Sequence, residues 1–529
     1  MVSVINGLGV LVMRKDLLAV LVIVSIVLAF SKTSCSPLTK ANIITSSTNG
    51  EYVLSAGYLS VGRNKTPFIA FVPPDRDHMY AVRINTIFIT YLFNCKIFGK
   101  YLYAVGTVYI PSSLSYDILL VKMTLSGDVI WAKTFGGDKF DAGTDLVLLP
   151  NGNIILVGNT YSFSRLGDAD VILILMDGNG KPIKAKVLGT MAYDDTVRKI
   201  KRMKDGNYIL LGETWSYNVS LSDAFLVKID NSLNVLWSYS YGGSSFEEAA
   251  DLIEFESGEL WVVGVSRSFI MGGNDGFILR LGKYGNIISV VGIGWKGDDG
   301  FLSIAKGKNS IYVVGYTSIR ESAGDPLVLV LSKNGSISQV YIFAHEGFDT
   351  FYTVNVNSGH ITMVGKISLK NDTLIVVDTK ELANITSIDL YTQIHDVTKI
   401  EFLKVKNYEN SIAKGSWIGR IQPLNITSNI QLATHTIQVT IDVSRVPKKV
   451  LAVYKGEYIK RVSFWEQLRE VLEANVPIVI LSIPFVIFLV IIIALKVKKI
   501  LSKLLEQQIL DQSQVYLRDD HRIFQIPFF

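Results

Sequence analysis

The stretch Asp145-Leu-Val-Leu-Leu-Pro-Asn-Gly-Asn-Ile-Ile-Leu-Val-Gly158 decides the fold. Two apolar runs flank its Asn-Gly pair, and this pattern predicts a β-hairpin because the tight turn needs positive φ. A second copy carries Asp205-Gly206 at the same place. The closing glycine returns after steps of 49, 52, 54, 52, 51, 50 and 50 residues, at Gly57, Gly106, Gly158, Gly212, Gly264, Gly315, Gly365 and, in a degenerate copy, Gly415.

A second predicted hairpin completes each repeat. Asp223 opens an apolar run, a polar turn follows, and the next run ends in Gly242-Gly243. Two hairpins give four strands, and a period near fifty residues built of four strands is typical of a β-propeller blade. Neighbouring blades cover each other's faces, so strands that are apolar on nearly every residue are expected. The sequence predicts an all-β propeller over residues 36–443 with seven four-stranded blades, or eight if the weak unit at residues 394–443 is one.

The repeats resemble those of archaeal and bacterial secreted and cell-surface β-propeller proteins. The resemblance rests on Asp205-Gly-Asn-Tyr-Ile-Leu-Leu-Gly212 and on Trp237 followed by Tyr241-Gly-Gly. It covers residues 40–390 closely and residues 390–443 loosely. It implies a propeller fold and an exported location. Because these families share no single activity, it implies no catalytic residue.

The N-terminus predicts export. Arg14-Lys15 precede an apolar run from Leu17 to Phe30, which is short for a membrane span and suits the core of a signal peptide. Residues 1–31 are therefore predicted to be a signal peptide, with an uncleaved anchor as the alternative.

The C-terminal part predicts one membrane span. Pro477–Leu495 has no charged residue and is long enough to cross a bilayer as a helix, and Lys496 follows it with further lysines. By the positive-inside rule, residues 476–497 are expected to span the cell membrane once, with the propeller outside and residues 498–529 as a cytoplasmic tail. Residues 444–475 are predicted to form a juxtamembrane connector with an amphipathic helix, or the first turns of the membrane helix.

Candidate modification sites agree with an exported, single-pass protein. Two cysteines, Cys35 and Cys95, are a candidate disulfide. Glycosylation is predicted at Asn-x-Ser/Thr triplets that all precede the predicted span, at Asn64, Asn218, Asn334, Asn371, Asn384 and Asn425.

Composition narrows the classes of function. The formal net charge is +5, and no basic stripe alternates with aromatic residues, so no nucleic-acid partner is expected. Richness in Ile, Val, Tyr and Lys, with 2 Cys and 6 His, is typical of a thermophilic archaeal source. No Gly-x-Ser-x-Gly elbow and no histidine pair at metal-ligand spacing occur. No catalytic residue is therefore predicted.

Two recurring acidic sets remain as candidate sites. One set opens the third strand of successive repeats, where each carboxylate is expected to cap its own turn, with a calcium site as the alternative: Asp117, Asp170, Asp223, Asp275 and Asp325. The other set lies near the start of each blade, at Asp145, Asp194-Asp195, Glu247-Glu248, Asp298-Asp299 and Asp349. Its equal spacing disfavours catalysis, which needs one asymmetric site, and no resident cofactor is expected.

The sequence therefore predicts a membrane-anchored surface propeller that binds extracellular protein or glycan partners through its loops. Two alternatives remain open. One is an anchored enzyme that hydrolyses glycans or peptides. The other is a structural subunit of a surface-layer or membrane assembly, in which the tail contacts a membrane or cytoplasmic partner.

Overall fold

The computed structural model describes residues 40–452. It does not describe, within that range, residues 62–63, 77, 86–87, 191–192, 216–220, 270–272, 320–323, 345–346, 369–371, 381, 383–386, 392–400, 405–411, 415–417, 422–424, 429–431, 437–439 and 448. The chain divides into two units, Met1–Val453 and Tyr454–Phe529, of which the second lies outside the described residues. So do the predicted signal peptide and the predicted span Pro477–Leu495. Within the described part, no helix is long and apolar enough to cross a membrane.

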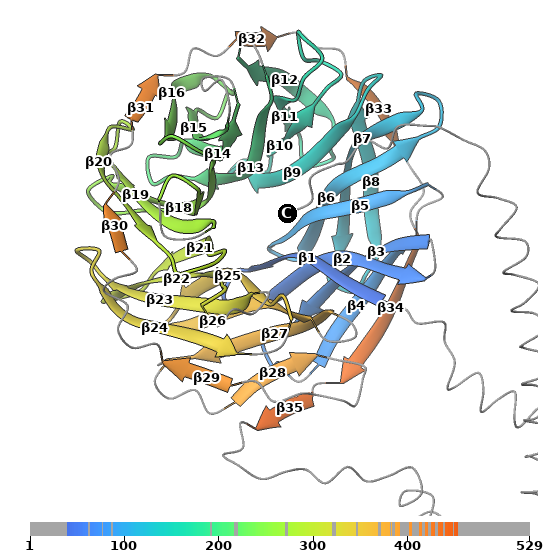
Figure 1. Ribbon diagram of the computed structural model, residues 1–529. Coiled ribbons are helices and arrows are strands. Elements are labelled where there is room, and N and C mark those ends of the chain that lie inside the picture. Colours follow the sequence, from blue (N-terminus) through green and yellow to red (C-terminus); the bar gives the residue numbers. More distant parts are fainter. Residues whose placement is uncertain are drawn as a thin grey trace, which may run out of the picture. The chain divides into compact units, whose positions relative to one another are not determined.

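Seven blades stand in a ring (Figure 1). Each blade is built from four consecutive antiparallel strands, and the first strand lies nearest the centre. The prediction of an all-β propeller with four-stranded blades is confirmed, and the number of blades is seven. In blade order, the strands are β1 (Lys40–Thr48), β2 (Val53–Val61), β3 (Asn64–Val72), β4 (His78–Asn85); β5 (Thr90–Phe98), β6 (Tyr101–Ile110), β7 (Ser115–Thr124), β8 (Val129–Gly136); β9 (Asp141–Leu148), β10 (Ile154–Thr160), β11 (Asp170–Met176), β12 (Pro182–Gly189); β13 (Asp195–Arg202), β14 (Tyr208–Thr214), β15 (Asp223–Ile229), β16 (Val235–Gly242); β17 (Glu247–Glu254), β18 (Leu260–Ser266), β19 (Asp275–Leu281), β20 (Ile287–Ile293); β21 (Gly300–Lys306), β22 (Ser310–Thr317), β23 (Asp325–Ser332), β24 (Ile337–Ala344); β25 (Thr350–Asn357), β26 (His360–Ser368), β27 (Asp372–Thr379) and β28 (Ser387–Tyr391).

Apolar side chains fill the junctions between blades. Between blades 3 and 4, for example, Val157 and Leu173 belong to one buried cluster with Leu210 and Phe225. Other clusters draw on neighbouring blades in the same way. A sheet buried on both faces needs apolar residues at successive positions, which is why the strands lack a polar alternation.

The recurring glycine lies opposite a bulge in the first strand of each blade. In blade 3 the pairing skips one residue between Gly143 and Asp145, opposite Gly158. The same irregularity occurs in all seven blades. At Gly158 a Cβ atom would overlap the carbonyl oxygen of Ala142, and at Gly212 that of Thr196. The glycine therefore recurs because the bulge brings one backbone against another.

A belt of short strands runs around the outside of the ring, and the predicted eighth unit is part of it. The belt strands add one antiparallel strand each to blades 6, 5, 4, 3, 2, 1 and 7, in that order (Figure 1). They are β29 (Glu401–Lys404), β30 (Ile412–Lys414), β31 (Ile418–Ile421), β32 (Asn425–Ser428), β33 (Ala433–Thr436), β34 (Thr440–Pro447) and β35 (Lys449–Ala452).

The belt corrects the interpretation of residues 394–443 as a weak eighth blade. Ile412–Lys414, which matched the repeat pattern, pairs with the outer strand of blade 5 instead of forming a hairpin with its neighbours. Each outer strand has an edge whose backbone N–H and C=O groups can pair with one further strand. A short strand can supply these partners without forming a hairpin of its own. The boundary predicted at residue 443 falls within β34, so the paired strands continue into the predicted connector.

Blades 1 and 7 close the ring without sharing a strand among β1–β28. Val53 and Phe68 of blade 1 pack in one buried cluster with Val364 and Leu374 of blade 7. The hydroxyl group of Tyr352 donates a hydrogen bond to the carbonyl oxygen of Ile43 (3.1 Å). The belt adds a covalent link, because β34 on blade 1 is separated from β35 on blade 7 by one residue.

Candidate functional site

The five predicted aspartates open the third strands of blades 2 to 6 and are buried. Asp170, Asp223, Asp275 and Asp325 begin their strands, and Asp117 lies two residues inside β7. All five are less than 10% exposed. Four of them lie close to an acid at the start of the next blade, and Gly324, which precedes the fifth, Asp325, accepts a backbone hydrogen bond from Asp349.

The facing acids are Asp141, Asp195, Glu247, Asp299 and Asp349, each 0% exposed. The backbones hold them in place: for example, the amide of Asp195 donates to the carbonyl oxygen of Ala169, the residue before Asp170 (2.6 Å), and three other junctions repeat this bond. Four of the five residues were predicted at the blade starts. The fifth was wrong, because Asp145 lies beyond the bulge of β9 and the equivalent residue is Asp141. We call each cross-blade couple an acid pair.

The acid pair Asp117–Asp141 shows what these carboxylates do. One point beside Gly136, where a Cβ atom would stand, lies within 3 Å of an oxygen of each carboxylate. Asp141 accepts hydrogen bonds from Gly137 N (2.9 Å), Thr160 Oγ1 (2.5 Å) and Ser162 Oγ (2.7 Å). The first-strand acid therefore fixes the glycine link between blades.

In several acid pairs, burial disfavours the charge of one or both carboxyl groups. Burial, and then the charge of Asp141, raise the pKa of Asp117 to about 7. Burial likewise raises the pKa of Asp170 to about 7, that of Glu247 to about 7 and that of Asp299 to about 6. Two buried carboxylates this close cannot both ionise without a large cost, so we expect the pairs that contain Asp117, Asp170, Glu247 and Asp299 to retain a proton up to about pH 6 to 7.

The acid pairs do not by themselves form a calcium site. Calcium takes six to eight oxygen ligands, whereas each pair offers two carboxylates, one of which is engaged by protein donors in the Asp117–Asp141 case. In the described part of the chain, no group of three or more His, Cys, Asp or Glu side chains could hold a metal ion. Calcium binding stays a sequence-based prediction.

Polar side chains beyond the bulges link the first strands of neighbouring blades. Asp145 of blade 3 accepts a hydrogen bond from Asn94 Nδ2 (3.1 Å) and pairs with Lys96 Nζ (2.6 Å), both from blade 2. Its other oxygen accepts from the amide of Ile200 in blade 4 (3.0 Å). We call the first strands of the seven blades the inner ring.

The inner ring has its strongest charge contrast between blades 4 and 5. Asp251 of β17 pairs with Lys199 Nζ (3.3 Å) and Lys201 Nζ (2.6 Å) of β13. Burial raises the pKa of Asp251, but the two ammonium groups outweigh it and hold this pKa well below its usual range. Ser303 Oγ of blade 6 donates to the same carboxylate (2.8 Å).

A second charged cluster at blades 4 and 5 has no counterpart in the repeat. Arg198 pairs with Glu248, and Glu213 accepts from Ser222 Oγ (3.1 Å). Burial, and then the charge of Glu248, raise the pKa of Glu213 to about 7. Thr196 Oγ1 lies 3.4 Å from Glu213 Oε1. The sequence analysis included Glu248 and missed Glu213. The only sequence signal for Glu213 is that the other repeats have a neutral or basic residue at its position.

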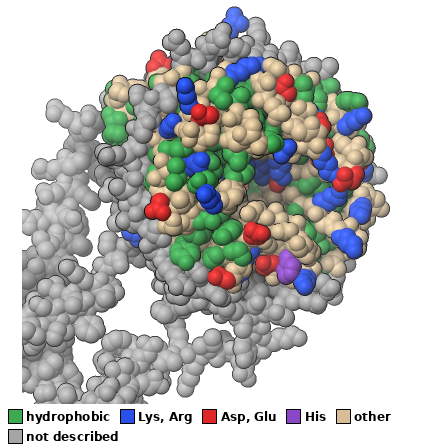
Figure 2. Space-filling view, turned by 180° about the vertical axis from the view of Figure 1, so that it is seen from behind, with side chains coloured by type: hydrophobic (Ala, Val, Ile, Leu, Met, Phe, Trp, Pro, Cys, Tyr) green, Lys and Arg blue, Asp and Glu red, His purple; other side chains and the backbone are tan. Residues whose placement is uncertain are grey.

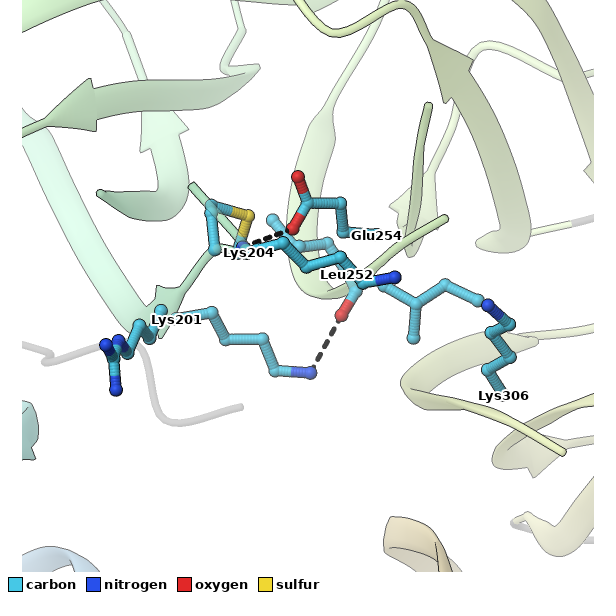
Figure 3. Close-up of a pocket in the computed structure, with 8 residues that line it drawn as sticks. Lys201, Lys204, Leu252, Glu254 and Lys306 are labelled. Atoms are coloured by element: carbon cyan, nitrogen blue, oxygen red, sulfur yellow. Dashed lines mark hydrogen bonds between the residues drawn. The ribbon is translucent and has the colours of Figure 1, made fainter. Parts of the chain in front are cut away.

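A pocket of about 400 Å³ lies where the first strands of blades 4, 5 and 6 end (Figure 3). Four of its lining residues are basic and one is acidic, the remainder being apolar: Lys201, Arg202, Lys204, Lys306, Glu254, Met203, Leu252 and Ile253. Figure 2 shows one face of the ring with a central hollow and Lys and Arg side chains around it. We call this cavity the basic pocket.

The predicted modification sites are only partly described. Asn334 is exposed in the turn between β23 and β24. Asn64 begins β3 and Asn425 begins β32. The remaining candidates, Asn218, Asn371 and Asn384, lie outside the described residues. Glycosylation stays a prediction at all six.

Cys35, the predicted disulfide partner of Cys95, lies outside the described residues. Cys95 itself is 1% exposed in β5, and burial raises the pKa of its thiol to about 12. A bridge between the two stays a prediction.

No protein-family model and no curated protein matches the chain. Similar solved structures include the β-propeller domain of the Trilobed protease from Pyrococcus furiosus (10% identity, TM-score 0.35, covering 62% of this chain and 98% of that one). Others are Pyrococcus horikoshii acylaminoacyl peptidase (11%, 0.34, 61% and 53%) and the endosialidase of phage phi92 (9%, 0.32, 63% and 65%). At these identities and TM-scores the similarities carry no argument about activity.

Proposed function

We propose that the chain is a membrane-tethered cell-surface propeller that binds an extracellular protein or glycan partner, without catalysis. The observation that carries this proposal is the contrast between repeated and unrepeated polar groups. The acid pairs recur at five junctions and fix the links between blades, which is a structural role. The basic pocket, by contrast, is lined by residues of blades 4 to 6, and the cluster of Asp251 with Lys199 and Lys201 joins blades 4 and 5.

The location belongs to the same proposal. The apolar run Pro477–Leu495 and the lysines after it support a single span with the propeller outside, and the N-terminal apolar run supports export. The described strands end at Ala452, so the propeller precedes the predicted span in the chain.

Co-purification tests the binding role. The full-length protein is recovered from its native membranes after mild cross-linking, and bound partners are identified by mass spectrometry. We expect one stoichiometric surface protein or glycan-bearing partner. Recovery of the chain alone, together with no binding to isolated surface glycans, would contradict the proposal. Protease treatment of intact cells tests the orientation: a tag in the exposed Asn334 turn should be lost while a tag after Phe529 is retained.

One observation favours a hydrolase as a second candidate. Burial and the charge of the neighbouring Glu248 raise the pKa of Glu213 to about 7, and Arg198 pairs with Glu248. An acid beside a carboxylate is the arrangement that glycoside hydrolysis requires. If surface glycans release reducing ends with the wild-type chain and not with Glu213→Gln, the chain is an enzyme. Equal rates in both would eliminate this candidate.

A further inference from the structure

The basic pocket is lined by charged and apolar residues of three blades. Figure 3 shows the Lys201 side chain directed at the backbone of Leu252, where its ammonium group donates to the carbonyl oxygen (2.8 Å). Glu254 lies beside Lys204 and accepts a hydrogen bond from its backbone amide (2.7 Å). Lys306 enters from blade 6. Three neighbouring blades therefore contribute to one cavity.

The charges of the pocket are a local departure from the repeat. The register of the first two strands makes Arg202 equivalent to Glu254 of blade 5 and Lys306 of blade 6. The same position is uncharged in the other four blades, where it is Thr48, Ile97, Leu148 and Val356. Blade packing alone does not call for these charges, since four blades pack without them.

Acidic neighbours neutralise only part of the basic charge. Lys201 pairs with Asp251, and Glu256 pairs with Lys204 and, at 3.6 Å, with Lys306. The Glu256 side chain is 83% exposed, so its attraction is strongly screened by solvent. Arg202 is exposed, and no ion pair of its guanidinium is found among the described residues. The pocket therefore keeps a positive balance and a planar donor group suited to a carboxylate or sulfate.

We propose that the basic pocket binds an acidic sugar, carrying a carboxylate or a sulfate group, at the end or within a surface glycan. Among the apolar lining residues, Met203 and Leu252 are buried in the core, and the half-buried Ile253 offers an apolar contact that suits the C–H face of a sugar ring and that a bare inorganic anion would not use. The volume of about 400 Å³ is in the range of small-ligand sites. This inference rests on the proposed binding function and names the ligand class for it.

Direct binding tests the inference. The full-length chain, purified in detergent, is titrated calorimetrically at pH 6 with trigalacturonate, with the neutral galactose trimer, with a sulfated galactose and with inorganic sulfate. We expect the acidic sugars to bind at least tenfold more tightly than the neutral trimer and than inorganic sulfate. Raising the salt from about 50 to about 500 mM should weaken this binding, since it screens the charges.

A pair of matched variants locates the site. Arg202→Ala with Lys306→Ala should weaken binding of the acidic sugars at least tenfold. The control, Lys181→Ala with Lys283→Ala, removes the same charge from exposed turns of blades 3 and 5 and should leave binding within twofold. Thermal unfolding of both double variants monitors folding; Arg202, Lys181 and Lys283 are exposed and Lys306 is half-buried.

Three outcomes would overturn the inference. Unchanged binding in the pocket variant would place the site elsewhere, and equal affinity for inorganic sulfate would remove the sugar from the assignment. Tighter binding of polyglutamate than of the acidic sugars would make the ligand an acidic peptide. If a surface partner co-purifies but no acidic sugar binds, the proposed function stands and this inference alone fails. If neither occurs, both fail.

Discussion

At the scale of the residue, buried carboxyl groups dominate the chemistry of this molecule. Asp117, Asp170 and Asp223 are buried between blades, each against the glycine that ends the fourth strand of its blade. Hydrogen bonds from Gly137, Thr160 and Ser162 lower the pKa of Asp141, but burial outweighs them and leaves this pKa raised. Asp141 also holds the glycine link between blades, because it accepts a hydrogen bond from the amide of Gly137.

The variant Asp117→Asn tests the protonated member. Because the pKa of Asp117 in the fold (about 7) lies above its usual value, the group stabilises the fold fully below about pH 4 and loses this contribution as the pH rises to about 7. Asparagine cannot ionise. We expect the variant to unfold within about 1 kcal/mol of wild type at pH 4.5 and to be more stable by a few kcal/mol at pH 8. Chemical denaturation at both pH values measures this, and a variant that is less stable at pH 8 would refute the protonated state.

The variant Asp251→Asn tests the carboxylate that links blades 4 and 5 in the inner ring. Removing this carboxylate leaves the ammonium groups of Lys199 and Lys201 without their partner, so we expect a loss of about 3 kcal/mol in unfolding free energy at pH 6. Glu256→Gln is the matched control, since this exposed side chain should contribute less than about 0.5 kcal/mol. Equal small effects of the two variants would show that Asp251 is not essential to the ring.

At the scale of the element, the belt is the feature that the blades themselves do not contain. Its strands have between three and eight residues, and each depends wholly on pairing with a blade edge. The belt covers the outer edge of all seven blades, which otherwise present unpaired backbone groups to other chains.

Replacing the belt tests this role. When residues 401–452 are exchanged for a Gly-Ser linker of equal length, we expect faster amide exchange in the outer strands β4, β8, β12, β16, β20, β24 and β28, and aggregation on heating. In the control, only residues 412–414 become Gly-Ser-Gly, and faster exchange should be confined to β20 of blade 5. Hydrogen exchange read by mass spectrometry distinguishes the two. Unchanged protection in the full replacement would mean that the blades need no belt.

The blades could be predicted from the sequence and the belt could not, for a physical reason. Asn151-Gly152 and Gly158 act locally, because a turn and a bulge are formed by residues close in the chain. By contrast, Asn425–Ser428 pairs with β12, more than two hundred residues away. No turn joins the two strands, so no local sequence pattern indicates that they pair. The same distinction explains the site: the aspartates recur visibly, but an acid pair joins two blades, and a bulge shifted Asp145 out of the position that its spacing indicated.

At the scale of the whole molecule, the acid pairs act together on stability. Five buried acids have raised pKa values: Asp117, Asp170, Asp195, Glu247 and Asp299. Below about pH 4 these groups contribute fully to the stability of the fold, and they lose this contribution as the pH rises through about 6 to 7. Asp251 acts in the opposite sense, because its pKa is lowered in the fold. Its contribution to stability is present at pH values above the usual pKa of an aspartate and is lost in strong acid.

We therefore expect a stability maximum near pH 4 to 5. The midpoint of thermal unfolding should fall by about 10 °C or more between pH 5 and pH 8. Circular dichroism melts from pH 3 to pH 9 at constant ionic strength measure this, and the variant Asp117→Asn serves as a control with a flatter profile. A midpoint that rises toward pH 8 would show that the pairs are ionised without penalty.

The belt has a mechanical consequence. The chain makes one circuit through blades 1 to 7 and then a second circuit in the opposite sense, ending with β34 on blade 1 and β35 on blade 7. A force applied to the chain after Ala452 would first detach β35, then β34, and then each earlier strand in turn. Load would thus be released in small successive steps at the rim before any blade is disturbed. A tether attached at this end would therefore dissipate a pulling force through the stepwise loss of belt strands.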